Sequence, residues 1–253
     1  MTKDVKREAK KWGTVATLIS ILVTMLASCE LGLNIQSDEE LDTEYGVKEY
    51  TYHDIVTINN FSDRETEEYI HVNDAGYVYE IFGEYTNIVI ETEMDALKAF
   101  SSVNEMFGIK NPYTEFRWVY SSNDSYVTQH QFVQMYNGYE VVNSGIEVVQ
   151  ARDEEAKSFI ISSVVPTEVL DGVADNLRQL LKITSKAAKE IVYKENKNTS
   201  YSDISVNALK WYPEYVDNTL TIRFVFEAEV EGSKIVYIDT ASGEVVNTIS
   251  TRN

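Results

Sequence analysis

Cysteine and proline are scarce in this sequence, and their scarcity limits how the protein can be built. One cysteine, Cys29, occurs in 253 residues, so neither an internal disulfide nor a multi-cysteine metal site can form. Three prolines and an aromatic share of 11%, with 17 tyrosines, are typical of a folded, strand-rich chain rather than a disordered one. The fold must therefore be held together by its hydrophobic core and not by covalent cross-links.

Positive charge is also scarce. The chain has 22 Lys and Arg residues against 41 Asp and Glu residues, which gives a net charge of −19. A surface this acidic repels phosphate backbones, so we expect no nucleic-acid partner. It also argues against a polybasic attachment to anionic lipid. We interpret the acidity as an aid to solubility rather than as a binding site.

The motifs of common enzyme classes are absent. A zinc protease needs two histidines on one helix face, as in HExxH, but His53, His71 and His130 are far apart and lie in strand-like stretches or loops. No GxSxG motif occurs, and neither a GxxxxGK[ST] nor a GxGxxG loop is present. The acidic runs 65–68 and 153–155 are typical of solvated loops. The sequence therefore predicts a protein that is not an enzyme, with no catalytic residue, no metal ligand and no cofactor.

The N-terminus has the pattern of a secretory leader. The first 11 residues contain five basic and two acidic side chains, and residues 12–28 contain no charge. A basic start followed by such an apolar run is typical of a signal peptide, and the run is shorter than the roughly 20 residues that a membrane-spanning helix needs. The residues that follow it decide between a cleaved leader and an uncleaved anchor.

The apolar run ends in Leu26-Ala27-Ser28-Cys29, which resembles a bacterial lipobox. The resemblance implies cleavage between Ser28 and Cys29 and attachment of lipid to Cys29. The alternative is an uncleaved signal anchor with a chance cysteine. We expect a lipoprotein signal peptide over residues 1–28 and an acidic tether over residues 29–48. The protein would then lie in the bacterial cell envelope, with its body outside the cytoplasm and the N-terminal lipid as its only membrane link.

Beyond the tether, the first half of the chain alternates strands with one helix. Runs at 49–58, 77–83 and 87–92 are rich in β-branched and aromatic residues, which predicts strands. Residues 93–107 change to a helical period, with Gly108 as a cap and one apolar face made of Met94, Leu97, Phe100, Val103 and Phe107. Residues 126–150 predict a long hairpin that turns at Asn137-Gly138, because Asn-Gly accepts the positive φ angles of a type I′ turn.

The second half repeats this order. Residues 171–198 are helical in character, with Thr184 or Ser185 as an N-cap, and three closing strand regions follow, the last ending near residue 250. Residues 220–230 place apolar side chains at every even position and polar ones at the odd positions, with only Val225 apolar among the latter, which predicts an antiparallel sheet with one wet face. The sequence thus predicts an α+β fold with two similar units, each a helix packed on an antiparallel sheet.

Two stretches resemble parts of known protease pro-regions. Residues 77–170, with "YVYEIFGEYTN" and "VTQHQFVQMYNGYEVVNSGIEVVQ", resemble the fungalysin/thermolysin propeptide motif. Residues 183–249, with "ITSKAAKEIV" and "TIRFVFEAEVEGSKIVYIDTASGEVV", resemble a PepSY domain. The resemblance implies two cystatin-like units, a propeptide-like domain over residues 49–170 and a PepSY-like domain over residues 171–253.

In thermolysin-like metalloproteases such a pro-region helps the catalytic domain to fold and blocks its zinc cleft until cleavage. No catalytic domain follows in this sequence. We therefore expect a non-catalytic protein that inhibits, chaperones or regulates a secreted metallopeptidase, with Thr251, Arg252 and Asn253 as a partner-facing tail. The alternative is a cell-surface binding or structural lipoprotein that uses the same folds for an unrelated ligand. A third reading is a decayed pro-region that has no partner.

Overall fold

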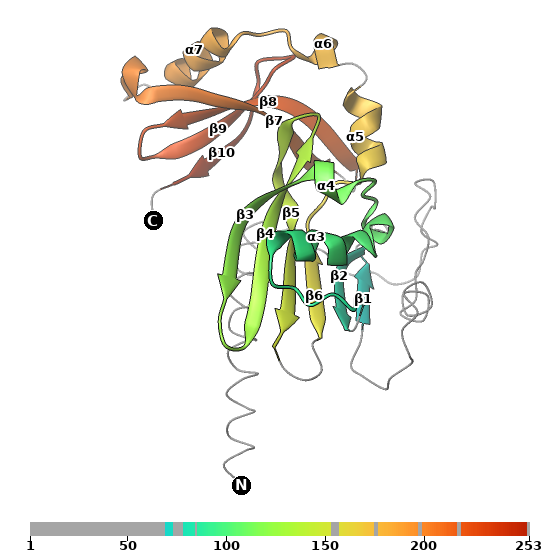
Figure 1. Ribbon diagram of the computed structural model, residues 1–253. Helices are drawn as coiled ribbons and strands as arrows, with labels where there is room; N and C mark the ends of the chain where they lie inside the picture. Colours follow the sequence, from blue (N-terminus) through green and yellow to red (C-terminus); the bar gives the residue numbers. More distant parts are fainter. Residues whose placement is uncertain are drawn as a thin grey trace, which may run out of the picture. The chain divides into compact units, whose positions relative to one another are not determined.

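The protein has an α+β fold in which helices pack on an extended sheet (Figure 1). This computed structural model describes residues 69–72, 78–83, 85–152, 157–174, 177–196, 199–216 and 219–251. These residues all fall within one compact unit, Thr43–Asn253. The predicted leader, the predicted tether and the strand predicted at 49–58 lie outside the described residues.

Among the described residues, the sheet has ten strands in the order β1-β2-β6-β5-β7-β8-β9-β10, with β4 paired to β5 and β3 paired to β4. All pairs are antiparallel except β5 with β7, which is parallel and limited to Glu140–Lys210 and Val141–Trp211. The strands are β1 (Tyr69–Val72), β2 (Val78–Gly83), β3 (Phe116–Asn123), β4 (Val127–Tyr136), β5 (Tyr139–Ala151), β6 (Ser158–Ser162), β7 (Ile204–Val216), β8 (Thr219–Val230), β9 (Lys234–Asp239) and β10 (Val245–Ser250). The long strand β5 thus connects the two predicted units through a single sheet.

One helical layer covers the sheet of the first half. It consists of α3 (Glu93–Ser101), the 3₁₀ helix η1 (Asn104–Phe107) and α4 (Pro112–Glu115). Thr92 begins α3 with a capping box, because its side chain accepts a hydrogen bond from the Asp95 amide while the Asp95 carboxylate accepts one from the Thr92 amide. The core beneath α3 and η1 contains Phe100, Phe107 and Phe132. The predicted helix over residues 93–107 is therefore divided, and its Met94 is exposed instead of buried.

The strand predicted at 87–92 is absent, and residues 85–90 form an irregular segment. A side chain replaces the missing strand partner there. The amide group of Gln150, on β5, accepts a hydrogen bond from the Ile90 N–H at 2.7 Å and donates one to the Ile88 carbonyl oxygen at 3.0 Å. The β-branched residues that suggested a strand here instead anchor the segment in the core, where Ile90 is buried.

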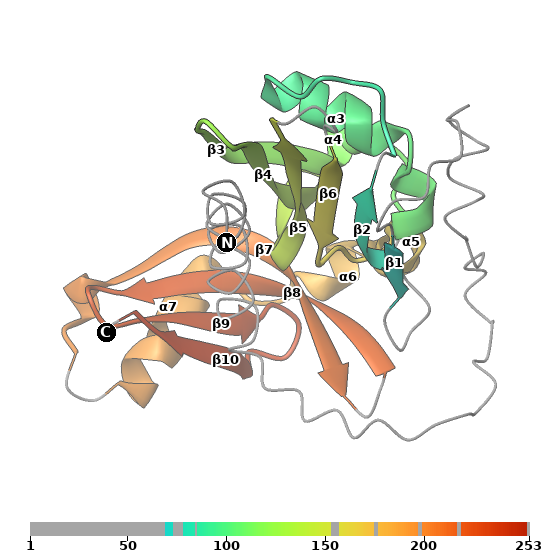
Figure 2. The same ribbon diagram turned by 90° about the horizontal axis from the view of Figure 1, so that it is seen from below.

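In the second half, α7 (Ser185–Glu195) packs on β7 and β8, which continue past β9 as a long pair (Figure 2). Of the two predicted N-cap candidates, Thr184 is the N-cap of α7, and its hydroxyl accepts a hydrogen bond from the Ala187 amide. The short helices α5 (Thr167–Ala174) and α6 (Leu177–Leu180) pack on a separate core around Trp211, Phe224 and Leu170. That core also contains Val141 of β5, so apolar packing accompanies the strand pairing between the two halves.

The face of β8 predicted to be wet is only partly so. Val225 is fully buried and Glu227 is largely covered, whereas Glu229 is exposed. Val225 packs with Tyr212 of β7 and Tyr237 of β9, whose ring centroids are 5.1 Å apart. Long aromatic side chains from neighbouring strands therefore cover the centre of this face, which alternation along one strand does not reveal.

Candidate functional site

Two turns contain the residues that the sequence singled out. The first joins β4 to β5, where Asn137 has φ 49° and Gly138 has φ 81°. Both angles lie in the positive region that a type I′ turn requires at its central positions. A Cβ at Gly138 would meet no atom within 4 Å, so the glycine is needed here for its backbone angle and not for space.

Below this turn, Gln134 fixes the hairpin to the segment that follows β6. The Gln134 side chain is fully buried and donates a hydrogen bond to the Val165 carbonyl oxygen at 2.7 Å, while its own oxygen accepts one from the Val165 amide at 2.9 Å. The Ser144 hydroxyl lies 2.6 Å from that side-chain oxygen and 2.8 Å from the Ser163 carbonyl oxygen, and its one hydrogen serves either acceptor. Because both the nitrogen and the oxygen of this buried side-chain amide are hydrogen-bonded, Gln134 fixes the position of the β6–α5 connection relative to β4.

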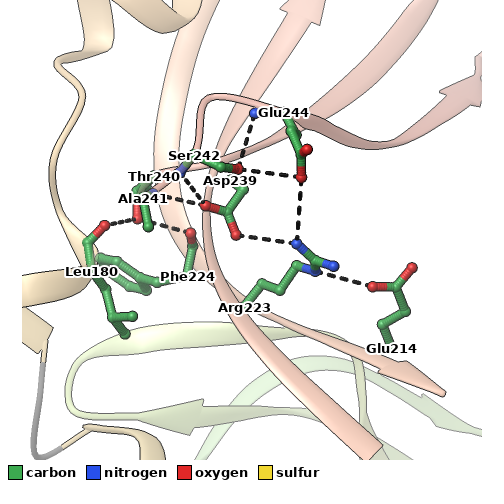
Figure 3. A network of polar contacts seen from close by, with 9 residues as sticks. All are labelled: Leu180, Glu214, Arg223, Phe224, Asp239, Thr240, Ala241, Ser242 and Glu244. Carbon is green, nitrogen blue, oxygen red and sulfur yellow. Dashed lines mark hydrogen bonds and ion pairs between the residues drawn. The ribbon is translucent and has the colours of Figure 1, made fainter. Parts of the chain in front are cut away.

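The second turn, Asp239 to Glu244, joins β9 to β10 (Figure 3). The Asp239 carboxylate accepts hydrogen bonds from the backbone amides of Ala241 at 2.7 Å and Ser242 at 2.8 Å. Gly243 has φ 80°, which only a residue without a Cβ adopts at low cost. The aspartate of the Asp-x-x-Ser-Gly sequence therefore stabilises its own turn, because its carboxylate accepts hydrogen bonds from two backbone amides within that turn.

Thr240, the next residue, attaches this turn to the α6–α7 connection. Its carbonyl oxygen accepts hydrogen bonds from the amides of Lys182 at 2.9 Å and Ile183 at 3.0 Å, and its hydroxyl lies within hydrogen-bond distance of the Leu180 and Phe224 carbonyl oxygens. Thr240 is fully buried. The turn is therefore tied through buried Thr240 to both the α6–α7 connection and strand β8.

Arg223, on β8, is directed toward the same turn (Figure 3). Its guanidinium lies 3.0 Å from the Glu214 carboxylate, 3.6 Å from that of Asp239 and 4.0 Å from that of Glu244. Burial lowers the pKa of Arg223, but the carboxylates of Glu214 and, after it, Asp239 outweigh burial, so that the net shift is upward. Because three carboxylates surround the guanidinium, Arg223 positions the turn and does not offer an open site for an external anion.

A second charged cluster lies where β5 meets β7. The Lys210 ammonium group lies 2.8 Å from a carboxylate oxygen of Glu140 and 2.8 Å from one of Glu227, and Arg117 lies 2.6 Å from the other oxygen of Glu140. Burial lowers the pKa of Lys210, but the hydrogen bonds to Glu140 and Glu227 overcome it and the net shift is upward. Two cations and two anions thus neutralise one another at the strand pair that connects the two halves.

A Ser–His pair occurs on β3 and β4, but it lacks the surroundings of a nucleophile. The Ser121 hydroxyl lies 2.7 Å from Nδ1 of His130 and accepts a hydrogen bond from the Trp118 indole at 2.8 Å. Burial lowers the pKa of His130. Its other ring nitrogen has no hydrogen-bond partner among the described residues, so no carboxylate orients the ring as a catalytic triad requires. We assign the pair to packing at the sheet edge.

The other predicted site residues are only partly within the described chain. Ser28 and Cys29 lie outside it, as do Arg252, Asn253 and His53. The Thr251 amide donates a hydrogen bond to the Ser233 carbonyl oxygen at 2.9 Å, directly after the end of β10. Among the described residues, no group of three or more His, Cys, Asp or Glu side chains is arranged to hold a metal ion. Within that same part of the chain, no helix is long and apolar enough to cross a membrane.

Sequence reasoning did not identify Gln134, Glu140, Lys210 or Arg223 as structurally important. Arg223 gave the clearest signal, because it is the single cation in an acidic, alternating strand. Gln134 precedes the Asn-Gly turn by three residues, but nothing in the sequence pairs it with Val165. Glu140 and Lys210 are 70 residues apart, and their contact depends on the strand pairing.

Comparison with known proteins gives little further information. No family model matches the chain, and no curated protein matches it. Among solved structures, the chain resembles the C-terminal domain of YpeB from Bacillus megaterium, with 14% sequence identity and a TM-score of 0.34. The match covers 76% of this chain and 81% of that one. A likeness at this level supports no conclusion about function.

Proposed function

We propose that the protein is a lipid-anchored, non-catalytic, propeptide-like protein that inhibits, chaperones or regulates a secreted thermolysin-like metallopeptidase. One observation supports the proposal: the two stretches that resemble pro-region motifs follow each other in the order found in pro-regions, and the residues that carry each resemblance occupy a strand-joining turn. Asn137-Gly138 joins β4 to β5, and the Asp239–Glu244 segment joins β9 to β10. In each motif, therefore, the residues that carry the resemblance also have a clear structural role.

The exposed end of the sheet is consistent with binding to a peptidase cleft. Strand β10 pairs only with β9 among the described strands, and Thr248, Ile249 and Ser250 at its end are exposed. An exposed edge strand can add to an extended backbone on a partner through main-chain hydrogen bonds. The tail of Thr251, Arg252 and Asn253 continues directly from this edge, and we propose that it faces the partner.

The lipid anchor has a direct test. Replacing Cys29 by serine removes the thiol that would be alkylated, and two or three acyl chains account for stable membrane attachment. We expect the Cys29→Ser variant to lose incorporation of labelled fatty acid and to release the body into the soluble fraction. A variant that stays in the membrane fraction with unchanged mass would show that the leader is an uncleaved anchor.

The proposed activity is tested with a soluble form spanning residues 49–253. We expect it to cleave no peptide substrate with or without zinc, and to slow a thermolysin-like enzyme from the same cell in a saturable way. Inhibition should survive replacement of all three histidines, because it needs shape complementarity and not a catalytic group. If no co-expressed metallopeptidase is inhibited or assisted in folding, the generic binding lipoprotein becomes the better reading.

The role of the tail can be separated from folding in the same assay. Deleting residues 251–253 removes one described hydrogen bond, from the Thr251 amide to Ser233, which is worth about 1 kcal/mol. We expect the inhibition constant to rise several-fold while the urea midpoint changes little. A truncated form of equal potency would exclude the tail from the inhibitory contact and leave the rest of the proposal standing.

A further inference from the structure

Strand β5, which lies between β4 and β6, has a buried carboxyl group in its middle (Figure 1). Glu147 pairs with Gln131 of β4 on one side and with Ile161 of β6 on the other. Its neighbours along β5, Ile146 and Val148, belong to the core beneath α3, so Glu147 points to the opposite face of the sheet. The residue is only 8% exposed. Glutamate is rarely buried to this extent unless its charge is paired.

The two oxygens of this carboxyl group have different surroundings. One accepts a hydrogen bond from the side-chain amide of Gln129, and the other is buried without a hydrogen-bond partner among the described residues. An ionised carboxylate in this position is costly, because burial removes its water and a single amide replaces only part of it. Burial accordingly raises the pKa of Glu147 to about 7, although the hydrogen bond from Gln129 opposes the shift.

The charged and titratable groups on the same face do not neutralise Glu147. Strands β4 and β6 place only uncharged side chains beside it. Farther along this face lie Glu80 with His71, Arg117 with Glu140, Tyr120 opposite Gln131, and Lys157 over the ring of Phe82. The pKa of Glu147 is therefore set by burial and, in the opposite direction, by Gln129.

We propose that Glu147 is a proton switch: the fold holds it as the uncharged acid, and loss of its proton places an unneutralised charge in the middle of the sheet. This property does not depend on the proposed function. Because β5 pairs with β4, β6 and β7, the charge would weaken the strand that joins the two halves. The folded-state pKa lies above the ordinary value of 4.5, so the stabilisation from the bound proton is fully present below that value and is lost as the pH rises through about 7.

Infrared spectroscopy of the full-length chain detects this proton directly. At about pH 6.5 ordinary aspartates and glutamates are ionised, so a carboxylic-acid C=O band reports a group with a raised pKa. We expect such a band in the wild type and its loss in Glu147→Gln. Gln129→Leu removes the hydrogen bond that favours the ionised form, so in that variant the band should persist to a higher pH than in the wild type. A band that is absent from the wild type, or that Glu147→Gln leaves unchanged, would overturn the proposal.

Urea denaturation of the same chain tests whether the proton controls stability. Glu147→Gln keeps the shape of the side chain but cannot ionise, so its urea midpoint should exceed that of the wild type by an amount that grows from about pH 5.5 to about pH 8. Glu229→Gln is the matched control, because Glu229 is an exposed glutamate on β8, and it should show no such growth. A gain in Glu147→Gln that does not change with pH would contradict the switch. If that variant does not fold, the pH at which the band disappears in Gln129→Leu decides the question.

Discussion

Replacing Gly145 by alanine is expected to lower the free energy of unfolding by on the order of 3 kcal/mol or more. Gly145 lies opposite Val133 in the β4–β5 pair. A Cβ at this position would fall well inside 3.0 Å of the Phe132 carbonyl oxygen and 3.2 Å from the Val133 Cα atom. Both obstacles are backbone atoms, which cannot rotate away, so the two strands would have to separate.

The damage would extend beyond one strand pair. The Gly145 carbonyl oxygen accepts a hydrogen bond from the Ser163 amide at 3.0 Å, and the neighbouring Ser144 hydroxyl contacts Gln134. Asn143, two residues earlier, already has a positive φ of 54°. The chain here therefore makes a sharp local adjustment that a side chain at residue 145 would oppose.

A urea denaturation series on residues 49–253 measures the effect, with Gly172→Ala as the matched control. Gly172 is an exposed residue of α5, and a Cβ there would meet nothing within 4 Å. Alanine at residue 172 should leave the free energy of unfolding unchanged or raise it by up to about 1 kcal/mol, because alanine has a higher helix propensity than glycine. Equal midpoints for the two variants would show that β4 and β5 do not approach each other closely at Gly145.

The local elements of this fold could be predicted from the sequence because their causes are local. The Asn137-Gly138 turn and the Thr184 cap each depend on the conformational preference of one or two residues. The alternation in residues 220–230 likewise identified strand β8. Such patterns need no knowledge of which segments pair.

The connection between the halves could not be predicted, because its causes are non-local. Two similar units were expected, and the sequence did not indicate that β5 and β7 would join them into one sheet. The prediction of a strand at 87–92 was wrong for a related reason. The backbone of that segment is hydrogen-bonded by the side chain of Gln150, which lies 60 residues from Ile90 in the sequence. In the candidate site, the glycine turns were visible in the sequence, whereas the pairing of Arg223 with the β9–β10 turn required the structure.

Replacing Lys210 by methionine should show how much this connection depends on charge. Methionine keeps most of the aliphatic stem but leaves the carboxylate of Glu227 without its cation, and Glu140 keeps only Arg117. Removing one partner of a largely buried ion pair costs more than the pair contributes, because the remaining charge is left unneutralised. We expect a loss of about 2–4 kcal/mol in unfolding free energy at pH 7.

The pH dependence of this loss has a definite sign. The pKa of Lys210 is raised in the folded protein, so its contribution is fully present at neutral pH and is lost only as the pH rises through that raised value. In the variant, Glu227 has lost the cation that neutralises it, whereas in the wild type that cation is present as long as Lys210 stays protonated. The difference between wild type and variant should therefore be fully present near neutral pH and shrink at alkaline pH, as the pH rises through the raised pKa of Lys210 and the wild type loses the same cation.

Lys98→Met is the matched control for Lys210→Met. Lys98 lies 3.6 Å from Asp95 on the surface of α3, and its side chain is 52% exposed. Exposed pairs of this kind contribute little, so we expect a change within about 0.5 kcal/mol and no marked pH dependence. If Lys210→Met behaves like this control, the Glu140 and Glu227 carboxylates are solvated without their cation. The two halves would then be joined by the apolar contacts of Val141 and Trp211 and not by the charged cluster.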